Sequence, residues 1–285
     1  MTKGRLVRNR IRRVRRRRRN VFFAVLTLMA GAGLYFALGA AGDETPQALN
    51  EDEQVESTTV AGSSPSETAS TSPSPEVETQ AAPPLYFSGT GTWEYAEPAT
   101  TGVVGAAGTL MRYNVAVENG IELDVNEFGA FVNATLADPR SWTASGGWRF
   151  EQVGQGGSAD FTVYLASPEQ RAILCGSQNT TVSCRNGDNV VINSARWITG
   201  VEHWDGPLDT YRQYAVNHEV GHRLGHGHEV CPGDGELSPV MAQQTYQLAG
   251  CVGNAWPYPD GSTYVSGPAG DYGGPDLPPD DFIDR

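Results

Sequence analysis

The sequence predicts one compact domain of the α+β class, between about Leu85 and Asp260. Segments with the two-residue period of strands alternate with segments that have the helical period. The sequence Asn-Gly-Asp at 186–188 separates two β-rich stretches, which is a strong hairpin signal. A length of about 175 residues is enough for one hydrophobic core.

The first half of this domain is predicted to hold a strand, a helix and two further strands. The helix begins at Asp124, which forms a capping-box-like pair with Glu127, and its apolar residues share one face. It ends before Asp138–Pro139, because the residue before a proline disfavours the helical conformation. The ranges are 110–117 (strand), 124–137 (helix), 148–153 (strand) and 161–165 (strand).

The second half is predicted to hold a hairpin and a long helix. The hairpin joins residues 181–185 to residues 189–193. The helix covers about 208–224 and places one stripe of residues on the core side. This stripe is formed by Leu208, Tyr211, Tyr214, Ala215, His218 and His222.

The long helix and the residues after it carry a metal-binding motif, HExxHxxGxxH. His218 and His222 are four residues apart, so both side chains can reach one ion from the same helix face. The intervening glutamate projects beside such an ion and can act as a general base toward activated water. A glycine with positive φ would end the helix and turn the chain back. The motif residues are His218, Glu219, His222, Gly225 and His228.

His226 competes with His228 as the third ligand. In a continuous helix it would share the face of the other two histidines, but it would lie about 12 Å along the axis from His218. His228 is therefore preferred, and His226 is expected at the rim. Three histidine ligands leave a fourth position open for water, as in catalytic sites. The predicted cofactor is one catalytic Zn²⁺.

A short turn-like stretch after the motif contains Met241. A lone methionine usually packs in a core. After this histidine motif, however, Ser238–Ala242 resembles the Met-turn of the metzincin zinc metallopeptidases. In that family the methionine lies beneath the zinc-binding imidazoles. The resemblance implies this role for Met241, and it implies a metzincin-like zincin domain with a twisted mixed β-sheet and an active-site helix.

The chain is also similar to a bacterial family of membrane-anchored metzincin-like domains, from about Gly102 to Pro259. The resemblance implies that the edge strand of the sheet, antiparallel to its neighbour, lines the cleft and pairs with an extended substrate. Residues 181–185 would supply that strand. The similarity is carried by YRQYAVNHEVGH at 211–222, GHGH at 225–228, CPG at 231–233, PVM at 239–241 and QQT at 243–245.

The sequence departs from the better-known metzincins in two respects. No tyrosine stands two residues after Met241, where astacin-like and serralysin-like enzymes carry one, although Tyr246 follows five residues after it. No separate pro-domain with a zinc-capping cysteine is found in the sequence. The group that would stabilise the oxyanion is left open among Tyr246, His203 and His226.

The chain begins with a basic arm and a long apolar segment. Residues 1–20 contain Lys3 and ten arginines, and the 22 residues 21–42 contain no charge. Such a segment can span a bilayer, and arginines before it favour a cytoplasmic N-terminus. We expect a single-pass anchor in the cell membrane with the catalytic domain outside. Small residues at 39–41 keep open a cleavable signal peptide, which would give a secreted protein.

Two further segments are predicted to be disordered. Residues 43–84 are rich in Ser, Thr, Pro and Glu and form a stalk, and residues 261–285 form an acidic tail. Outside the basic arm, nine Lys and Arg stand against 33 Asp and Glu, a net charge of −24. This charge argues against nucleic acid or an anionic lipid surface as a partner. The sequence makes no prediction about the oligomeric state.

All four cysteines follow the apolar segment. An even number in an exported chain predicts disulfides, although ligation of zinc by cysteine is the alternative. No CxxC spacing supports that alternative. Of the three pairings, the local one is the simplest: Cys175 with Cys184, and Cys231 with Cys251. The second bond would enclose Met241 in its loop.

These features together predict an extracytoplasmic zinc metallopeptidase with a peptide or protein substrate. In this hypothesis Glu219 removes a proton from water and passes it to the leaving amine. Two alternatives stay open: a zinc-binding surface protein without catalysis, and a zinc hydrolase acting on cell-wall peptide amides. The sequence does not distinguish endopeptidases from exopeptidases.

Overall fold

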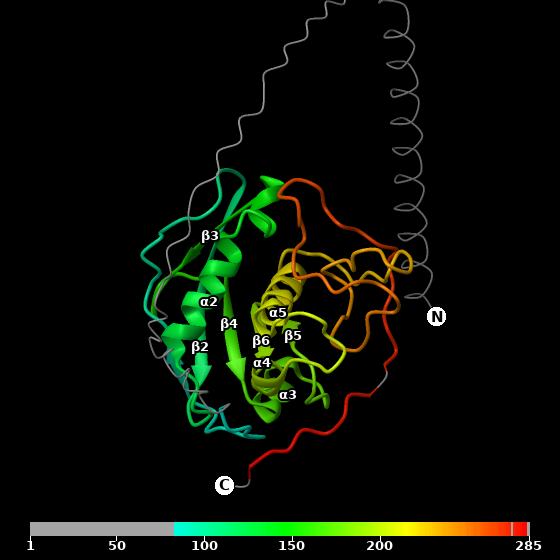
Figure 1. Cartoon of the computed structure of the whole chain (residues 1–285). Helices are drawn as coiled ribbons and strands as arrows, with labels where there is room; N and C mark the ends of the chain where they lie inside the picture. Colours follow the sequence, from blue (N-terminus) through cyan, green and yellow to red (C-terminus); the bar gives the residue numbers. More distant parts are fainter. Residues whose placement is uncertain (1–82, 275, 284–285) are drawn as a thin grey trace, which may run out of the picture. The chain divides into compact units, whose positions relative to one another are not determined.

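The computed structural model describes residues 83–274 and 276–283, where a mixed six-stranded sheet is accompanied by four α-helices (Figure 1). The strands are β1 (Trp93–Tyr95), β2 (Thr109–Glu118), β3 (Trp148–Gln152), β4 (Phe161–Ala166), β5 (Cys184–Asn186) and β6 (Asn189–Asn193). The helices are α2 (Val125–Ala137), α3 (Pro168–Cys175), α4 (Ser194–Thr199) and α5 (Leu208–Arg223), with a short 3-10 helix η1 (Trp142–Ser145).

Parallel strands form the centre of the sheet, and antiparallel strands form its edges. The order is β1-β2-β4-β6-β5, and β3 pairs in parallel with the first half of β2. Val115, Val163 and Val190 lie in register across the three central strands and are fully buried. The edge strand β5 runs antiparallel to β6, as predicted, and Gly187 has the positive φ that the turn between them requires.

Helices α2 and α5 pack against each other and against the sheet. In Figure 1 both helices lie in front of the strands. The Asp124 side chain accepts hydrogen bonds from the backbone N–H groups of Asn126 and Glu127, both at 2.8 Å, and so begins α2 where predicted. Phe128 and Val132 of α2 are buried in the same core as Val216 and Val220 of α5. This core holds α5 rigidly against the sheet.

The predicted helices and most predicted strands are confirmed, but β5 is shorter than predicted. The backbone N–H groups of Thr181 and Val182 bond to the Asn179 side chain instead of a neighbouring strand. Strand pairing therefore begins only at Cys184. Strand β1 and helices α3 and α4 are not predicted from the sequence. The signals for α3 were present, because Ser167 caps it and Pro168 occupies its first turn.

The predicted disordered tail is wrong for most of its length. From Gly261 onward the chain runs along the domain, and the Val230 N–H donates to the Pro268 carbonyl at 2.8 Å. Further along, Asp280 pairs with the buried Arg196, and the Ile283 N–H donates to the Leu85 carbonyl. A few anchoring side chains and backbone bonds thus hold a segment that composition alone describes as unable to fold.

The remaining predictions about the chain's ends fall outside the described residues. These are the basic arm 1–20, the anchor 21–42 and the stalk as far as residue 82. Among the helices that the structure describes, none has the length and apolar character needed to span a bilayer.

Candidate metal centre

Helix α5 carries the first half of the predicted site. Its inner face is buried, and His218 and Glu219 are each 5% exposed. The ring of Tyr214 packs 5.4 Å from the ring of His218, and its hydroxyl donates to the Ala242 carbonyl at 3.0 Å. Helical spacing brings the rings of His218 and His222 to 4.7 Å between centroids. The helix therefore holds two potential ligands and the carboxylate in one rigid unit.

The helix ends in a Schellman motif centred on Gly225. The His226 N–H donates to the Gly221 carbonyl at 3.0 Å, and the Gly225 N–H donates to the His222 carbonyl at 3.2 Å. Gly225 has a φ of 100°, a conformation that side-chain-bearing residues rarely adopt. As predicted, this glycine turns the chain so that His228 returns toward the helix.

His228, and not His226, completes the histidine cluster. Nε2 of His222 lies 3.2 Å from Nε2 of His218 and 3.0 Å from Nε2 of His228. Three nitrogens that each bind one ion tetrahedrally at about 2.0–2.1 Å stand about 3.3 Å apart. The observed separations are close to this value, so the three residues could hold one metal ion.

The other ring nitrogen of each histidine faces an acceptor. Nδ1 of His218 contacts the Val240 carbonyl at 2.8 Å, and Nδ1 of His222 contacts the His226 carbonyl at 2.9 Å. Nδ1 of His228 contacts Oδ1 of Asp271 at 2.5 Å. These partners place the proton on Nδ1, so each Nε2 presents a lone pair.

Three lone pairs that converge at such distances repel one another, because none of the nitrogens can donate a hydrogen bond. A cation between them removes the repulsion. Burial also lowers the pKa of His218 and of His222, which favours the neutral, metal-binding form of both rings. The donor set and its protonation therefore fit a resident metal ion.

Glu219 lies in the wall of the same cavity. Its Oε2 atom is buried and has no hydrogen-bond partner among the described residues. Burial raises the pKa of Glu219 to about 8, and the nearby charge of Arg171 opposes that rise. The charge of a metal ion at the three histidines would act in the same direction as Arg171 and lower the pKa of Glu219. Among the described residues, no hydrogen bond ties this carboxylate into the fold.

The predicted turn around Met241 is present. The Ala242 N–H donates to the Pro239 carbonyl at 2.9 Å, which closes the turn, and Met241 is fully buried. A methyl group on Gly221 would lie 2.5 Å from the Met241 sulfur, so this glycine of α5 lets the turn pack tightly against the helix. Because the same turn supplies the Val240 carbonyl to His218, its packing positions a potential ligand directly.

The three other predicted site residues have different roles. Tyr246 lines the cavity, and its hydroxyl accepts a hydrogen bond from the Asn179 side chain at 3.0 Å. The His226 ring lies tilted against the Trp142 ring at 4.4 Å between centroids, while the His226 carbonyl orients His222. His203 does not line the cavity and bonds to the Gln244 carbonyl.

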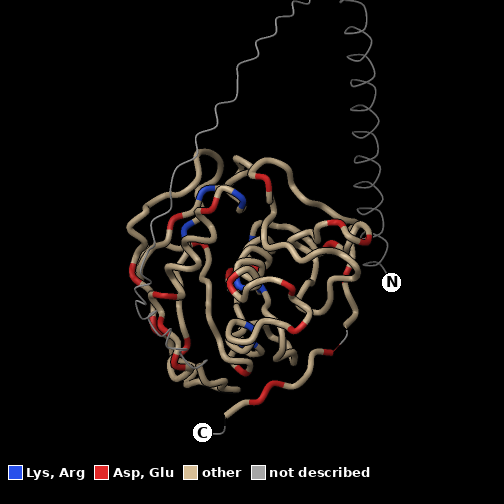
Figure 2. The backbone as a smooth tube through the Cα atoms, in the orientation of Figure 1, with Lys and Arg blue, Asp and Glu red and all other residues tan. Residues whose placement is uncertain are grey.

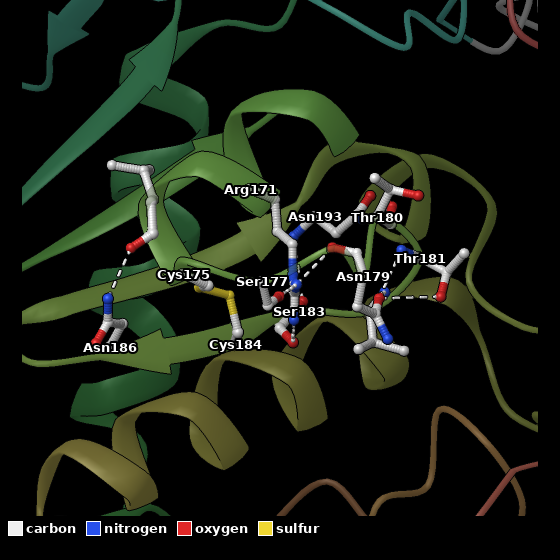
Figure 3. Close-up of a disulfide and its surroundings, with 12 residues drawn as sticks. Arg171, Cys175, Ser177, Asn179, Thr180, Thr181, Ser183, Cys184, Asn186 and Asn193 are labelled. Atoms are coloured by element: carbon white, nitrogen blue, oxygen red, sulfur yellow. Dashed lines mark hydrogen bonds between the residues drawn. A yellow bond between two sulfur atoms is a disulfide. The ribbon is translucent and has the colours of Figure 1, made fainter.

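Both predicted disulfides are present, and one of them fixes the cavity wall. Cys231 bonds to Cys251 around the Met241 turn, and Cys175 bonds to Cys184 between α3 and β5 (Figure 3). Beside the latter bond, the buried Arg171 donates to the carbonyls of Asn179 and Ser183 and so holds the loop that leads into β5. Neither this role of Arg171 nor its place in the cavity wall was predicted.

The cavity above the histidines has a volume of about 530 Å³. Its wall combines α5, the edge strand β5 with the preceding loop, and the residues after the Met241 turn. The surrounding domain is poor in positive charge, because eight arginines and no lysine occur among the described residues. Figure 2 shows few blue positions (Lys and Arg) on the tube of this domain. Two of these arginines, Arg171 and Arg185, line the cavity.

Comparison with known proteins identifies a family but no activity. A family described as "Protein of unknown function (DUF3152)" matches residues 80–253, a range that includes the three histidines, Glu219 and Met241. No curated protein and no solved structure matches the chain significantly. Since the matched range covers more than half of the sequence, the chain belongs to the DUF3152 family.

Proposed function

We propose that the protein is a zinc-dependent metallopeptidase of metzincin-like architecture. The observation that carries this proposal is the convergence of three histidines, each oriented through its Nδ1 atom, beside a buried carboxylate whose Oε2 atom has no hydrogen-bond partner among the described residues. Imidazole ligands suit zinc, and three of them leave a coordination position open. A protein that merely stored the ion would have no use for Glu219 in this position.

Zinc bound at His218, His222 and His228 would polarise a carbonyl group and activate water. Glu219 takes a proton from the attacking water and delivers it to the leaving nitrogen. In the net reaction the water oxygen bonds to the carbonyl carbon, the C–N bond breaks, and the amine gains the proton. Of the three residues considered for the oxyanion, Tyr246 and His226 line the cavity and His203 does not.

The edge strand β5 supports a peptide as the substrate. It ends the sheet beside the cavity, and an extended peptide could add to its free edge through backbone hydrogen bonds. The two disulfides agree with an extracytoplasmic location, as the predicted anchor or signal peptide does. A hydrolase of cell-wall peptide amides would use the same residues, and no described contact favours it.

The test compares the wild-type protein with Glu219→Gln in zinc content and in cleavage of a diverse peptide library. We expect both to hold one zinc, and we expect the variant to cleave about 10²- to 10⁴-fold more slowly. A chelator should abolish wild-type cleavage, and added zinc should restore it. The matched control is Glu236→Gln, an exposed glutamate outside the cavity wall. Full activity of Glu219→Gln, or cleavage without zinc, would contradict the proposal.

A further inference from the structure

Arg185 is the single arginine among the described residues whose guanidinium group has neither an ion pair nor a hydrogen bond within that part of the chain. Each of the other seven binds a carboxylate or a carbonyl oxygen. They are Arg112, Arg140, Arg149, Arg171, Arg196, Arg212 and Arg223.

A shortage of carboxylates does not explain this isolation, because acidic residues greatly outnumber basic ones outside the N-terminal arm. The nearest acidic residue in sequence, Asp188, pairs instead with Arg223 at 3.2 Å. Arg185 is therefore exposed on an acidic domain and has no partner among the described residues.

The position of Arg185 on β5 directs its side chain into the cavity. Its neighbours Cys184 and Asn186 both reach toward α3, the first through the disulfide and the second through a hydrogen bond to the Leu174 carbonyl (Figure 3). Side chains alternate along a strand, so Arg185 points to the opposite face. There it lines the cavity together with His222.

The other charged groups of the cavity wall cannot take the place of Arg185. Arg171 is buried, and its terminal nitrogens donate to the loop before β5. Glu219 is the only acidic residue among those that line the cavity, and it is buried beside the metal ligands. Arg185 is exposed, and its backbone is fixed by pairing with β6 and by the adjacent disulfide.

We propose that Arg185 binds a carboxylate of the substrate, so that the site selects peptides with an acidic group close to the bond that is cleaved. This inference rests on the proposed function and adds a substrate class to it. The guanidinium group matches a carboxylate in planar, two-point geometry. The carboxylate can come from an aspartate or glutamate side chain, or from the C-terminus of the peptide.

The experiment measures binding, so that it does not depend on turnover. Zinc-loaded Glu219→Gln protein is titrated with fluorescent peptide pairs that differ only by Glu against Gln at one position. A second set of pairs carries a free or an amidated C-terminus. The same titrations are repeated with double variants that combine Glu219→Gln with Arg185→Gln, Arg185→Lys or Arg185→Glu. Arg112→Gln is the matched control, because Arg112 is exposed and lies outside the cavity wall.

We expect the acidic member of a pair to bind about 5- to 10-fold more tightly, and we expect this preference to weaken in high salt. Arg185→Gln should remove the preference, Arg185→Lys should retain part of it, and Arg185→Glu should invert it. The pair set that shows the effect identifies the source of the carboxylate.

The inference is overturned if acidic peptides bind no better than neutral ones, or do not bind at all. It is also overturned if the preference persists in Arg185→Gln, since the carboxylate would then be bound by the metal or another group. Failure of the proposed function has a different signature, which is the absence of zinc-dependent cleavage by the wild-type protein.

Discussion

The two halves of the candidate metal centre are built by different means. The helical half consists of His218, Glu219 and His222, whose relative positions follow from the spacing of one buried helix. The other half brings His228, the Met241 turn and Asp271 together from separate irregular segments. Helical geometry thus needs only local sequence, whereas the loop half depends on contacts between residues far apart in the chain.

The hydrogen bonds that orient the ligands show the same division. His222 is oriented by the His226 carbonyl, only four residues away. His218 depends on Val240, and His228 depends on Asp271, 22 and 43 residues away. The candidate metal centre is therefore completed by the turn, by the Cys231–Cys251 bond that encloses it, and by the segment after Gly261.

Removal of a ligand from either half should have the largest effect on metal binding. We expect His222→Ala and His228→Ala each to lose more affinity for zinc than the about 10- to 100-fold typical of changes behind the ligands. Equilibrium dialysis against a competing chelator measures this. The control is His203→Ala, because His203 does not line the cavity. Unchanged affinity in either ligand variant would remove that histidine from the site.

Asp271→Asn tests the loop half without removing a ligand. The neutral amide would weaken the orientation of His228, and we expect affinity for zinc to fall by about 10- to 100-fold while the fold is retained. The same dialysis measurement applies, with Asp276→Asn, another exposed aspartate of this segment, as the control. If both variants bind zinc like the wild type, the Asp271 side chain has no part in orienting His228.

Gly225→Ala tests the junction between the two halves and should have the smallest effect. A methyl group at Gly225 meets no atom within 4 Å, so its cost comes from the positive φ alone. We expect a loss of about 1–2 kcal/mol in the free energy of unfolding, measured by denaturant titration. Gly227→Ala is the control, because it also lies in open space but lacks a positive φ. Equal losses in both variants would show that the turn conformation is not the cause.

The same contrast explains what could be predicted from the sequence. Helix α5, its ligands, the turn at Gly225 and the edge strand follow from short-range patterns, and the disulfide pairs follow from the short spacings between cysteines. Arg171 was missed because its helix is only eight residues long and its partners lie in a loop. Asp271 was missed because a segment rich in Gly, Pro and Asp has no periodicity, although tertiary contacts order it.

The most direct test of the account is X-ray absorption spectroscopy at the zinc edge of the purified wild-type protein, with the metal content measured in the same sample. We expect one zinc per chain, with three imidazole nitrogens at about 2.0–2.1 Å and a further light-atom ligand from solvent. A folded protein without zinc, or zinc bound by cysteine sulfur or by four protein ligands, would contradict the claim that these histidines form an open, catalytic metal centre.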